Sequence, residues 1–128
     1  MTDYDSVRYA SLADRNVLIT GGASGIGAEM VKAFASQGSI VSFIDIDTQA
    51  GAAMAAATGA EFIACDLTDI AALRSAVARV EDKKGAVAVL VNNAARDDRH
   101  AMAEVEPEAW RRTLALNLDH QFLSLIHI

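Results

Sequence analysis

The sequence has 128 residues, of which 52% are hydrophobic and 5% aromatic, and its formal net charge is -6 with a pI near 4.9. This length suits one domain at most. The net negative charge and the lack of a cluster of basic residues argue against nucleic acid and against an anionic membrane as partners. No stretch is long enough to span a bilayer, and residues 1–15 contain no apolar leader, so we expect a cytoplasmic protein.

Histidine and cysteine are scarce in this chain. The three histidines and the single cysteine, Cys65, form no pair at metal-ligand spacing, so no metal site is expected and a disulfide within the chain is excluded. Cys65 lies in an apolar run and is expected to be a buried small hydrophobe.

Short apolar runs alternate with helical patterns along the chain. Residues 1–14 are polar and are expected to be a flexible lead, with Leu12 packed on the domain edge. The patterns predict strands at 16–20, 40–45, 61–65 and 87–91, and helices at 26–37, 48–58, 70–84 and from Glu108 onward, with Pro107 in the first turn. They therefore predict an α/β fold, a Rossmann-type doubly wound parallel sheet in the order 3-2-1-4, truncated after the fourth strand and the following helix.

The first strand leads into a loop with glycines at 21, 22, 25 and 27, and a helical pattern follows. Glycine allows the backbone to turn with positive φ and lets a phosphate approach closely. The free amides and the positive dipole end of the next helix then face that phosphate. The loop predicts a pyrophosphate site, and a plain connecting turn is the alternative for the glycines taken alone.

Asp45, followed by Ile46, ends the second predicted strand on the ligand side of the sheet. A carboxylate there can accept both ribose hydroxyls of an adenosine, and it repels a 2′-phosphate by roughly 1 to 4 kcal/mol for each unit charge at about 4 Å. No Arg or Lys lies between Gly38 and Gln49 to offset that repulsion. NAD is therefore predicted in preference to NADP, and a solvated Asp at the strand end is the alternative.

The glycine spacing, preceded by a threonine, resembles the cofactor loop of the short-chain dehydrogenase/reductase family. The resemblance extends over residues 12–122. It implies that the following loop residues bind the cofactor: Thr20, Gly21, Ser24, Gly25, Ile26 and Gly27.

Two further segments match cofactor-binding positions of that family. Asp66 and Leu67 follow the third strand, where the family's Asp-Leu or Asp-Val pair holds the adenine, and a helix N-cap at Asp66 or Asp69 is the alternative. The run Asn92-Asn93-Ala94-Ala95 matches the family motif Asn-Asn-Ala-Gly. The resemblance implies that its asparagine steadies the central strands, while the backbone of Asn93, Ala94 and Ala95 passes along the nicotinamide-side ribose. Ala95 stands where the motif has Gly and is expected to narrow the backbone approach slightly.

Asn117 lies among apolar residues in the last predicted helix, where an amide needs a hydrogen-bonding partner. It matches the helix asparagine of the family's catalytic tetrad, which holds a water in the proton relay. The alternative is a surface asparagine that bends the helix.

Residues 97–100, Trp110 and residues 119–122 resemble a subgroup that oxidises aldoses, such as bacterial xylose dehydrogenases. This resemblance implies a homo-oligomeric parent that transfers hydride between NAD and a sugar or another secondary alcohol. Two alternatives are reduction of a 3-oxoacyl thioester or another ketone, and, in a different class, a dinucleotide-binding module without catalysis.

The family's catalytic Tyr-x-x-x-Lys pair is absent from this sequence. The only tyrosines, Tyr4 and Tyr9, are followed four residues later by Arg8 and Ala13, so we expect the chain alone to be inactive. Residues 123–128 are what one reading frame of a transposase adapter encodes. We therefore expect residues 1–122 to be the cofactor-binding part of a single Rossmann domain and residues 123–128 a non-native read-through tail, with an ordinary helix end as the alternative.

Overall fold

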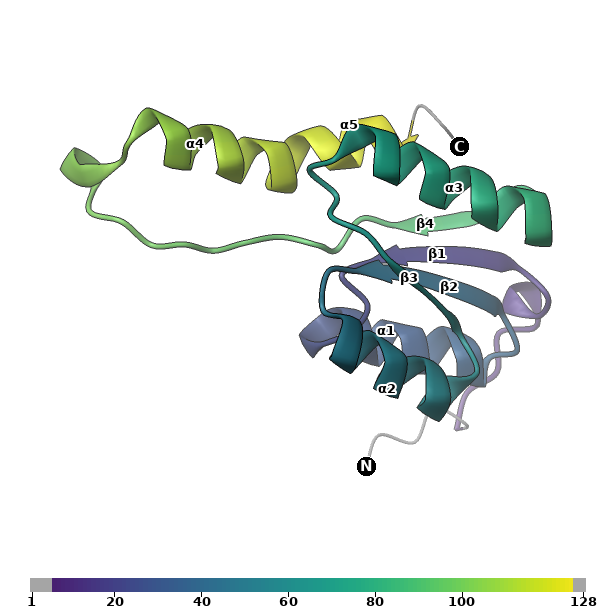
Figure 1. Cartoon of the computed structure of the whole chain (residues 1–128). Helices are drawn as coiled ribbons and strands as arrows, with labels where there is room; N and C mark the ends of the chain where they lie inside the picture. Colours follow the sequence, from purple (N-terminus) through teal and green to yellow (C-terminus); the bar gives the residue numbers. More distant parts are fainter. Residues whose placement is uncertain (1–5, 126–128) are drawn as a thin grey trace.

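The computed structural model describes residues 6–125 and contains one parallel sheet in the order β3-β2-β1-β4 (Figure 1). The predicted fold class and strand order are confirmed. The central strand β1 pairs with β2 along its whole length and with β4 from Val17 to Ile19. The strands span Asn16–Thr20 (β1), Ile40–Asp45 (β2), Glu61–Ala64 (β3) and Val89–Val91 (β4).

Helices cover both faces of the sheet (Figure 1). On one face lie α1 and α2, and on the other lie α3 and α5, while α4 continues α5 past the carboxyl ends of the strands. A π-helical turn, Ala115–Asp119, joins α4 to α5. The helices span Gly25–Ser36 (α1), Thr48–Thr58 (α2), Ile70–Lys84 (α3), Pro107–Leu114 (α4) and His120–Leu125 (α5).

The apolar side chains of β1 are divided between two cores because successive residues of a strand point to opposite faces. Leu18 packs with Ile44 and Val77 on the side of α3, and Val17 packs with Val31 on the side of α1. Thr20 has the same parity as Leu18, so its side chain points toward the layer of α3 and α5.

The lead before β1 is docked on α1, so the prediction of a flexible segment is wrong for the described residues 6–14. The Arg8 guanidinium donates to the Ser36 carbonyl at 2.6 Å, and the Tyr9 amide donates to the Gln37 side chain at 2.8 Å. The last carbonyls of a helix lack partners within the helix, and the lead supplies a donor to one of them. Leu12 is half-buried, while residues 1–5 lie outside the described part of the chain.

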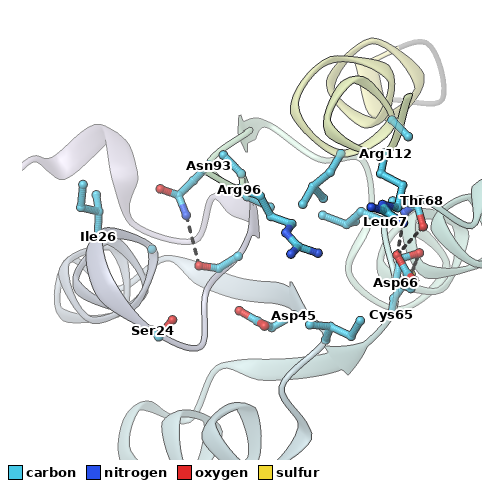
Figure 2. Close-up of a pocket in the computed structure, with 17 residues that line it drawn as sticks. Ser24, Ile26, Asp45, Cys65, Asp66, Leu67, Thr68, Asn93, Arg96 and Arg112 are labelled. Atoms are coloured by element: carbon cyan, nitrogen blue, oxygen red, sulfur yellow. Dashed lines mark hydrogen bonds between the residues drawn. The ribbon is translucent and has the colours of Figure 1, made fainter. Parts of the chain in front are cut away.

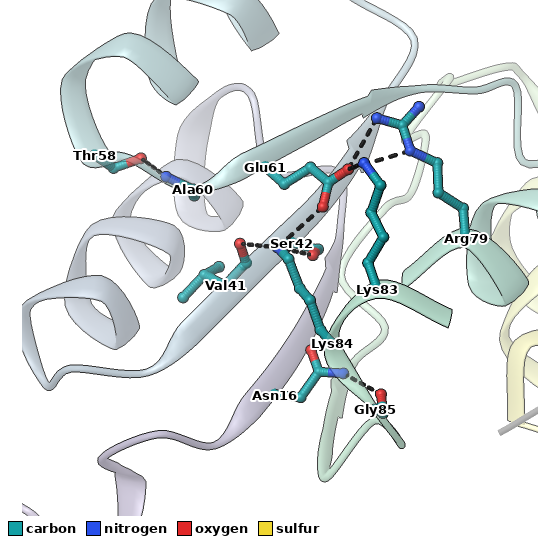
Figure 3. Close-up of polar contacts among 10 residues, drawn as sticks. All are labelled: Asn16, Val41, Ser42, Thr58, Ala60, Glu61, Arg79, Lys83, Lys84 and Gly85. Carbon is teal, nitrogen blue, oxygen red and sulfur yellow. Dashed lines mark hydrogen bonds and ion pairs between the residues drawn. The ribbon is translucent and has the colours of Figure 1, made fainter. Parts of the chain in front are cut away.

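Ion pairs fasten α3 to the edge of the sheet where the strands begin (Figure 3). Glu61, the first residue of β3, pairs with Arg79, Lys83 and Lys84 at N–O distances of 2.8, 3.3 and 3.0 Å. Lys84 also donates to the Ser42 hydroxyl of β2 at 2.8 Å. This cluster lies at the opposite edge from the loops that follow the strands. Within residues 6–125, no helix is both long and apolar enough to cross a membrane.

Candidate functional site

A cavity of about 620 Å³ opens where the parallel strands end, between the loops after the strands and α4 (Figure 2). In a doubly wound sheet this edge is where ligands bind. Most of the predicted cofactor residues line the cavity: Gly21, Ser24, Ile26, Gly27, Asp45, Ile46, Asp66, Leu67, Asn93, Ala94 and Ala95. Thr20 lies behind them and is fully buried.

The glycine loop is tightly packed on its inner side and open on its outer side. A β-carbon on Gly27 would lie 1.9 Å from the Gly21 carbonyl oxygen and 2.6 Å from Asn93 Nδ2, so only glycine fits there. Gly25 has φ of 55°, and a β-carbon on it would meet no heavy atom of the described residues within 4 Å. The backbone at Gly25 is thus accessible to a ligand.

The start of α1 is suited to an anion. Ser24 precedes the helix in an extended conformation, and within residues 6–125 its hydroxyl makes no capping hydrogen bond to the first turn. The first amides of a helix carry partial positive charge and need acceptors. Because Ser24, Ile26 and Gly27 line the cavity, these amides are a fit for a phosphate group.

Asp45 ends β2 with its carboxylate held in one orientation. Its Oδ2 accepts from the Ala23 amide at 2.9 Å and its Oδ1 accepts from the Asp47 amide at 3.0 Å. A carboxylate has more acceptor sites than these two amides use, so it can still accept from hydroxyl groups. Beside it, Ile46 is 69% exposed, and across the cavity Ile26 is 71% exposed. Both isoleucines offer an apolar surface to a flat ring.

Asp66 and Asp69 have different roles at the end of β3. Asp69 caps α3 by accepting from the Ala72 amide at 3.0 Å. Asp66 lines the cavity and accepts from the hydroxyl and the amide of Thr68 at 2.7 and 2.9 Å, which lowers the pKa of its carboxyl. Asp69 is therefore the N-cap, and Asp66 is a ligand candidate with an ionised side chain. Leu67 is buried beside it.

Cys65 differs from its prediction. It is half-buried and lines the cavity, because β3 ends at Ala64 and the chain turns away from the core there. Burial raises the pKa of its thiol, and the nearby carboxylates of Asp66 and Asp69 raise it further.

Asn93 and Thr20 join the ends of β4 and β1. The Asn93 side chain donates to the carbonyls of Thr20 and Gly21, both at 3.1 Å. In return, the Thr20 hydroxyl accepts from the amides of Asn93 and Ala94 at 3.0 and 3.1 Å. Thr20 therefore holds the cavity wall from behind and does not line the cavity itself.

Asn117 lies in the π-helical turn and holds the loop after β4. Its Nδ2 donates to the Arg96 carbonyl at 2.8 Å and its Oδ1 accepts from the Arg96 amide at 2.9 Å. The amide thus has the partners that its place in the helix requires. Asn117 is next to Leu116, which lines the cavity, but the structure does not place Asn117 itself among the lining residues. Its role in a proton relay stays a prediction.

Sequence reasoning missed two cations in the cavity wall. Arg96 and Arg112 both line the cavity, and Figure 2 shows Arg96 extending into the space between Asp45 and Asp66, with Arg112 on the side of Asp66. Arg96 also pairs with Asp98 at 2.9 Å. Both arginines lie far from Asp45 in the sequence and outside the segment from Gly38 to Gln49. The position of Arg96 directly after the Asn-Asn-Ala-Ala run was the available signal. In the described part of the chain, no group of three His, Cys, Asp or Glu residues is placed to hold a metal ion.

Comparisons with known proteins agree with this geometry. Residues 15–125 match the short chain dehydrogenase family profile. A probable galactose dehydrogenase of Rhizobium meliloti is 48% identical over 123 residues, and a D-xylose 1-dehydrogenase of Caulobacter vibrioides is 40% identical over 120. These alignments cover 91% and 90% of this chain but 48% and 47% of the relatives, so the chain spans about half their length.

A solved structure has the same arrangement. The 3-ketoacyl-(acyl-carrier-protein) reductase of Brucella melitensis, complexed with NADH, superposes with a TM-score of 0.84 at 30% identity. The match covers 90% of this chain and 48% of that one. Together with the profile match over most of the chain, these likenesses show that the chain belongs to the short-chain dehydrogenase/reductase family.

Proposed function

We propose that this chain is the dinucleotide-binding half of an oxidoreductase that transfers hydride between a nicotinamide cofactor and a sugar or another secondary alcohol. The main support for this proposal is the orientation of Asp45, whose carboxylate faces the cavity directly beyond the glycine loop. The NADH complex of the Brucella reductase, a family relative, supports the same class of ligand.

Each part of the cavity wall suits one part of a dinucleotide. The amides at the start of α1 would receive the pyrophosphate, with Gly25 leaving room for its approach. Asp45 would accept from the adenosine ribose, and Asp66 from the adenine amino group. The cofactor would supply the hydride chemistry, while this chain's residues bind and orient it. Asn117 would hold the loop at Arg96 in place beside it.

We further propose that NAD is preferred to NADP. The Asp45 carboxylate repels a second phosphate on the same ribose, and its two hydrogen bonds to backbone amides fix it in that place. Arg96, one of the two cations in the cavity wall, is paired with Asp98 and so is partly neutralised. Arg112 is the other cation in the cavity wall, and its charge opposes the repulsion between Asp45 and a 2′-phosphate.

A sugar substrate is supported by the names of two relatives, galactose dehydrogenase and D-xylose 1-dehydrogenase. Reduction of a 3-ketoacyl thioester is the second candidate, because the similar Brucella structure is such a reductase. The 128 residues contain no Tyr-x-x-x-Lys, so the chain by itself is expected to bind a dinucleotide without turnover. A homo-oligomeric parent stays a prediction.

Calorimetric titration of the chain with NADH and NADPH tests the cofactor proposal. NADH should bind at least about tenfold more tightly than NADPH, which corresponds to about 1.4 kcal/mol. Asp45→Asn should reduce this preference, because it removes the repelling charge. Asp47→Asn is the matched control: it removes the same charge two residues away, at the N-cap of α2 and outside the cavity wall. A preference for NADPH, or equal loss in both variants, would refute the role of Asp45.

A further inference from the structure

His120 is a buried polar residue that the proposed cofactor contacts do not use. It is the first residue of α5, its side chain is fully buried, and it lies between the helix and the end of β1. Its Nε2 is 3.3 Å from the Thr20 hydroxyl, and its Nδ1 contacts the carbonyl of Leu116 one turn earlier. A buried imidazole with a neighbour at each nitrogen has its protons assigned by those neighbours.

The partners of Thr20 determine which ring nitrogen carries the proton. The Thr20 oxygen already accepts from the amides of Asn93 and Ala94, which occupies both of its lone pairs. The hydroxyl hydrogen is then left to donate, and His120 Nε2 is the acceptor beside it. Nε2 is therefore unprotonated. The Leu116 carbonyl can only accept, so Nδ1 carries the hydrogen and donates to it.

The same helix segment is attached to the strand ends at two other points. The Asn117 side chain holds the backbone of Arg96, and the Ser124 hydroxyl donates to Asn92 Oδ1 at 3.0 Å. His120 is the member of this set that reaches the central strand β1. Burial also lowers the pKa of His120, which favours the neutral ring despite the opposing effect of the Leu116 carbonyl.

We infer that His120 is a positioning residue for the dinucleotide cavity: as the neutral Nδ1–H tautomer, it directs the Thr20 hydroxyl and thereby keeps the Asn93 and Ala94 amides in place. The inference rests on the proposed function only where it concerns dinucleotide affinity. His120 links the helix segment that carries Asn117 to the part of the cavity wall formed by the ends of β1 and β4.

The tautomer is tested directly in the chain labelled with isotopic histidine. A proton–nitrogen correlation spectrum near neutral pH should show, for His120, one protonated Nδ1 and one bare Nε2. His120→Gln identifies the signal by removing it. A proton on Nε2, alone or on both nitrogens, would overturn the inference whether or not the chain binds a dinucleotide.

The positioning role is tested by two substitutions that differ in one acceptor. His120→Leu fills the space without an acceptor for Thr20, and His120→Gln offers an amide oxygen in place of Nε2. Amide hydrogen exchange at Asn93 and Ala94 should accelerate about tenfold in the leucine variant and recover in the glutamine variant, because an unpaired buried hydroxyl reorients.

Val80→Ala is the control. Val80 is fully buried in α3, so its truncation lowers the stability of the fold through lost packing alone. NADH affinity should fall about tenfold in His120→Leu and stay within about twofold of the native value in the other two variants. Unchanged exchange in His120→Leu, or equal acceleration in Val80→Ala, would overturn the positioning role. If the native chain binds no NADH, the proposed function fails, while the spectrum and the exchange rates still decide the role of His120. Should His120→Leu not fold, the spectrum of the native chain decides.

Discussion

The carboxylate of Glu61 should make the stability of this domain depend on acid pH. Glu61 lies at the start of β3 with 17% of its side chain exposed, and it contacts the ammonium groups of Lys83 and Lys84 and the guanidinium of Arg79 (Figure 3). Burial by itself raises the pKa of Glu61, but the hydrogen bonds from Lys84, Arg79 and Lys83 outweigh it and lower the pKa from 4.5 to about 2.

The lowered pKa of Glu61 stabilises the folded chain at neutral pH and loses this effect in acid. The folded pKa lies below the unfolded one, so the stabilisation is complete above the unfolded pKa of 4.5 and is lost as the pH falls toward about 2. The full shift corresponds to about 3 kcal/mol. Arg79 and Lys83 are 51% and 57% exposed, so solvent screening reduces the expected contribution to about 1 to 3 kcal/mol.

Denaturant unfolding of the native chain and of Glu61→Gln, at neutral pH and in acid, measures this contribution. The variant should be less stable by about 1 to 3 kcal/mol at neutral pH, and the difference should shrink as the pH falls from about 5 toward 2. Glu29→Gln is the matched control, because Glu29 is 51% exposed in α1 and its pair with Lys32 is screened. A difference between native chain and Glu61→Gln that stays constant or grows in acid would refute the reasoning.

Three further predictions concern the cavity wall. Gly27→Ala places a β-carbon 1.9 Å from the Gly21 carbonyl, so it should cost about 1 to 3 kcal/mol in thermal unfolding and remove NADH binding, and native-like binding would contradict the packing. Asn93→Ala removes the donor to the carbonyls of Thr20 and Gly21, so it should lower the free energy of unfolding. A decrease of less than about 0.5 kcal/mol would show that these hydrogen bonds are dispensable. Burial lowers the pKa of His120 below 6.5, so the free energy of unfolding should fall as the pH drops through 6.5, and this part of the pH dependence should vanish in His120→Gln.

Local patterns predicted the secondary structure closely. The first two strands and the helices at 48–58 and 70–84 have the predicted bounds, because apolar runs, Asp47 and Asp69 as caps and Gly59 as a left-handed end are all encoded within a few residues. The fourth strand begins at Val89, two residues later than predicted, since its first pairing is Val17 with Val89. Strand ends depend on the neighbouring strand, which the local pattern does not contain.

The N-terminal segment before β1 is a second case in which the local pattern does not contain the partner. A polar segment without a period gives no local sign of a partner, yet Arg8 and Tyr9 reach the end of α1, more than twenty residues away in sequence. Cys65 is a similar case, because its exposure is set by where β3 ends relative to β2.

Local sequence patterns were enough to predict the Rossmann sheet, the glycine loop, and the meeting of Asp45, Asp66 and the Asn-Asn-Ala-Ala run around one cavity. Parallel strands bring their carboxyl ends to one edge, so residues that follow strands must meet there. The places of Arg96 and Arg112 in the cavity wall, and the contact of His120 with Thr20, became visible in the folded chain alone. The direction of a helical side chain depends on how its helix packs across the sheet, and that packing is set by contacts between residues far apart in the chain.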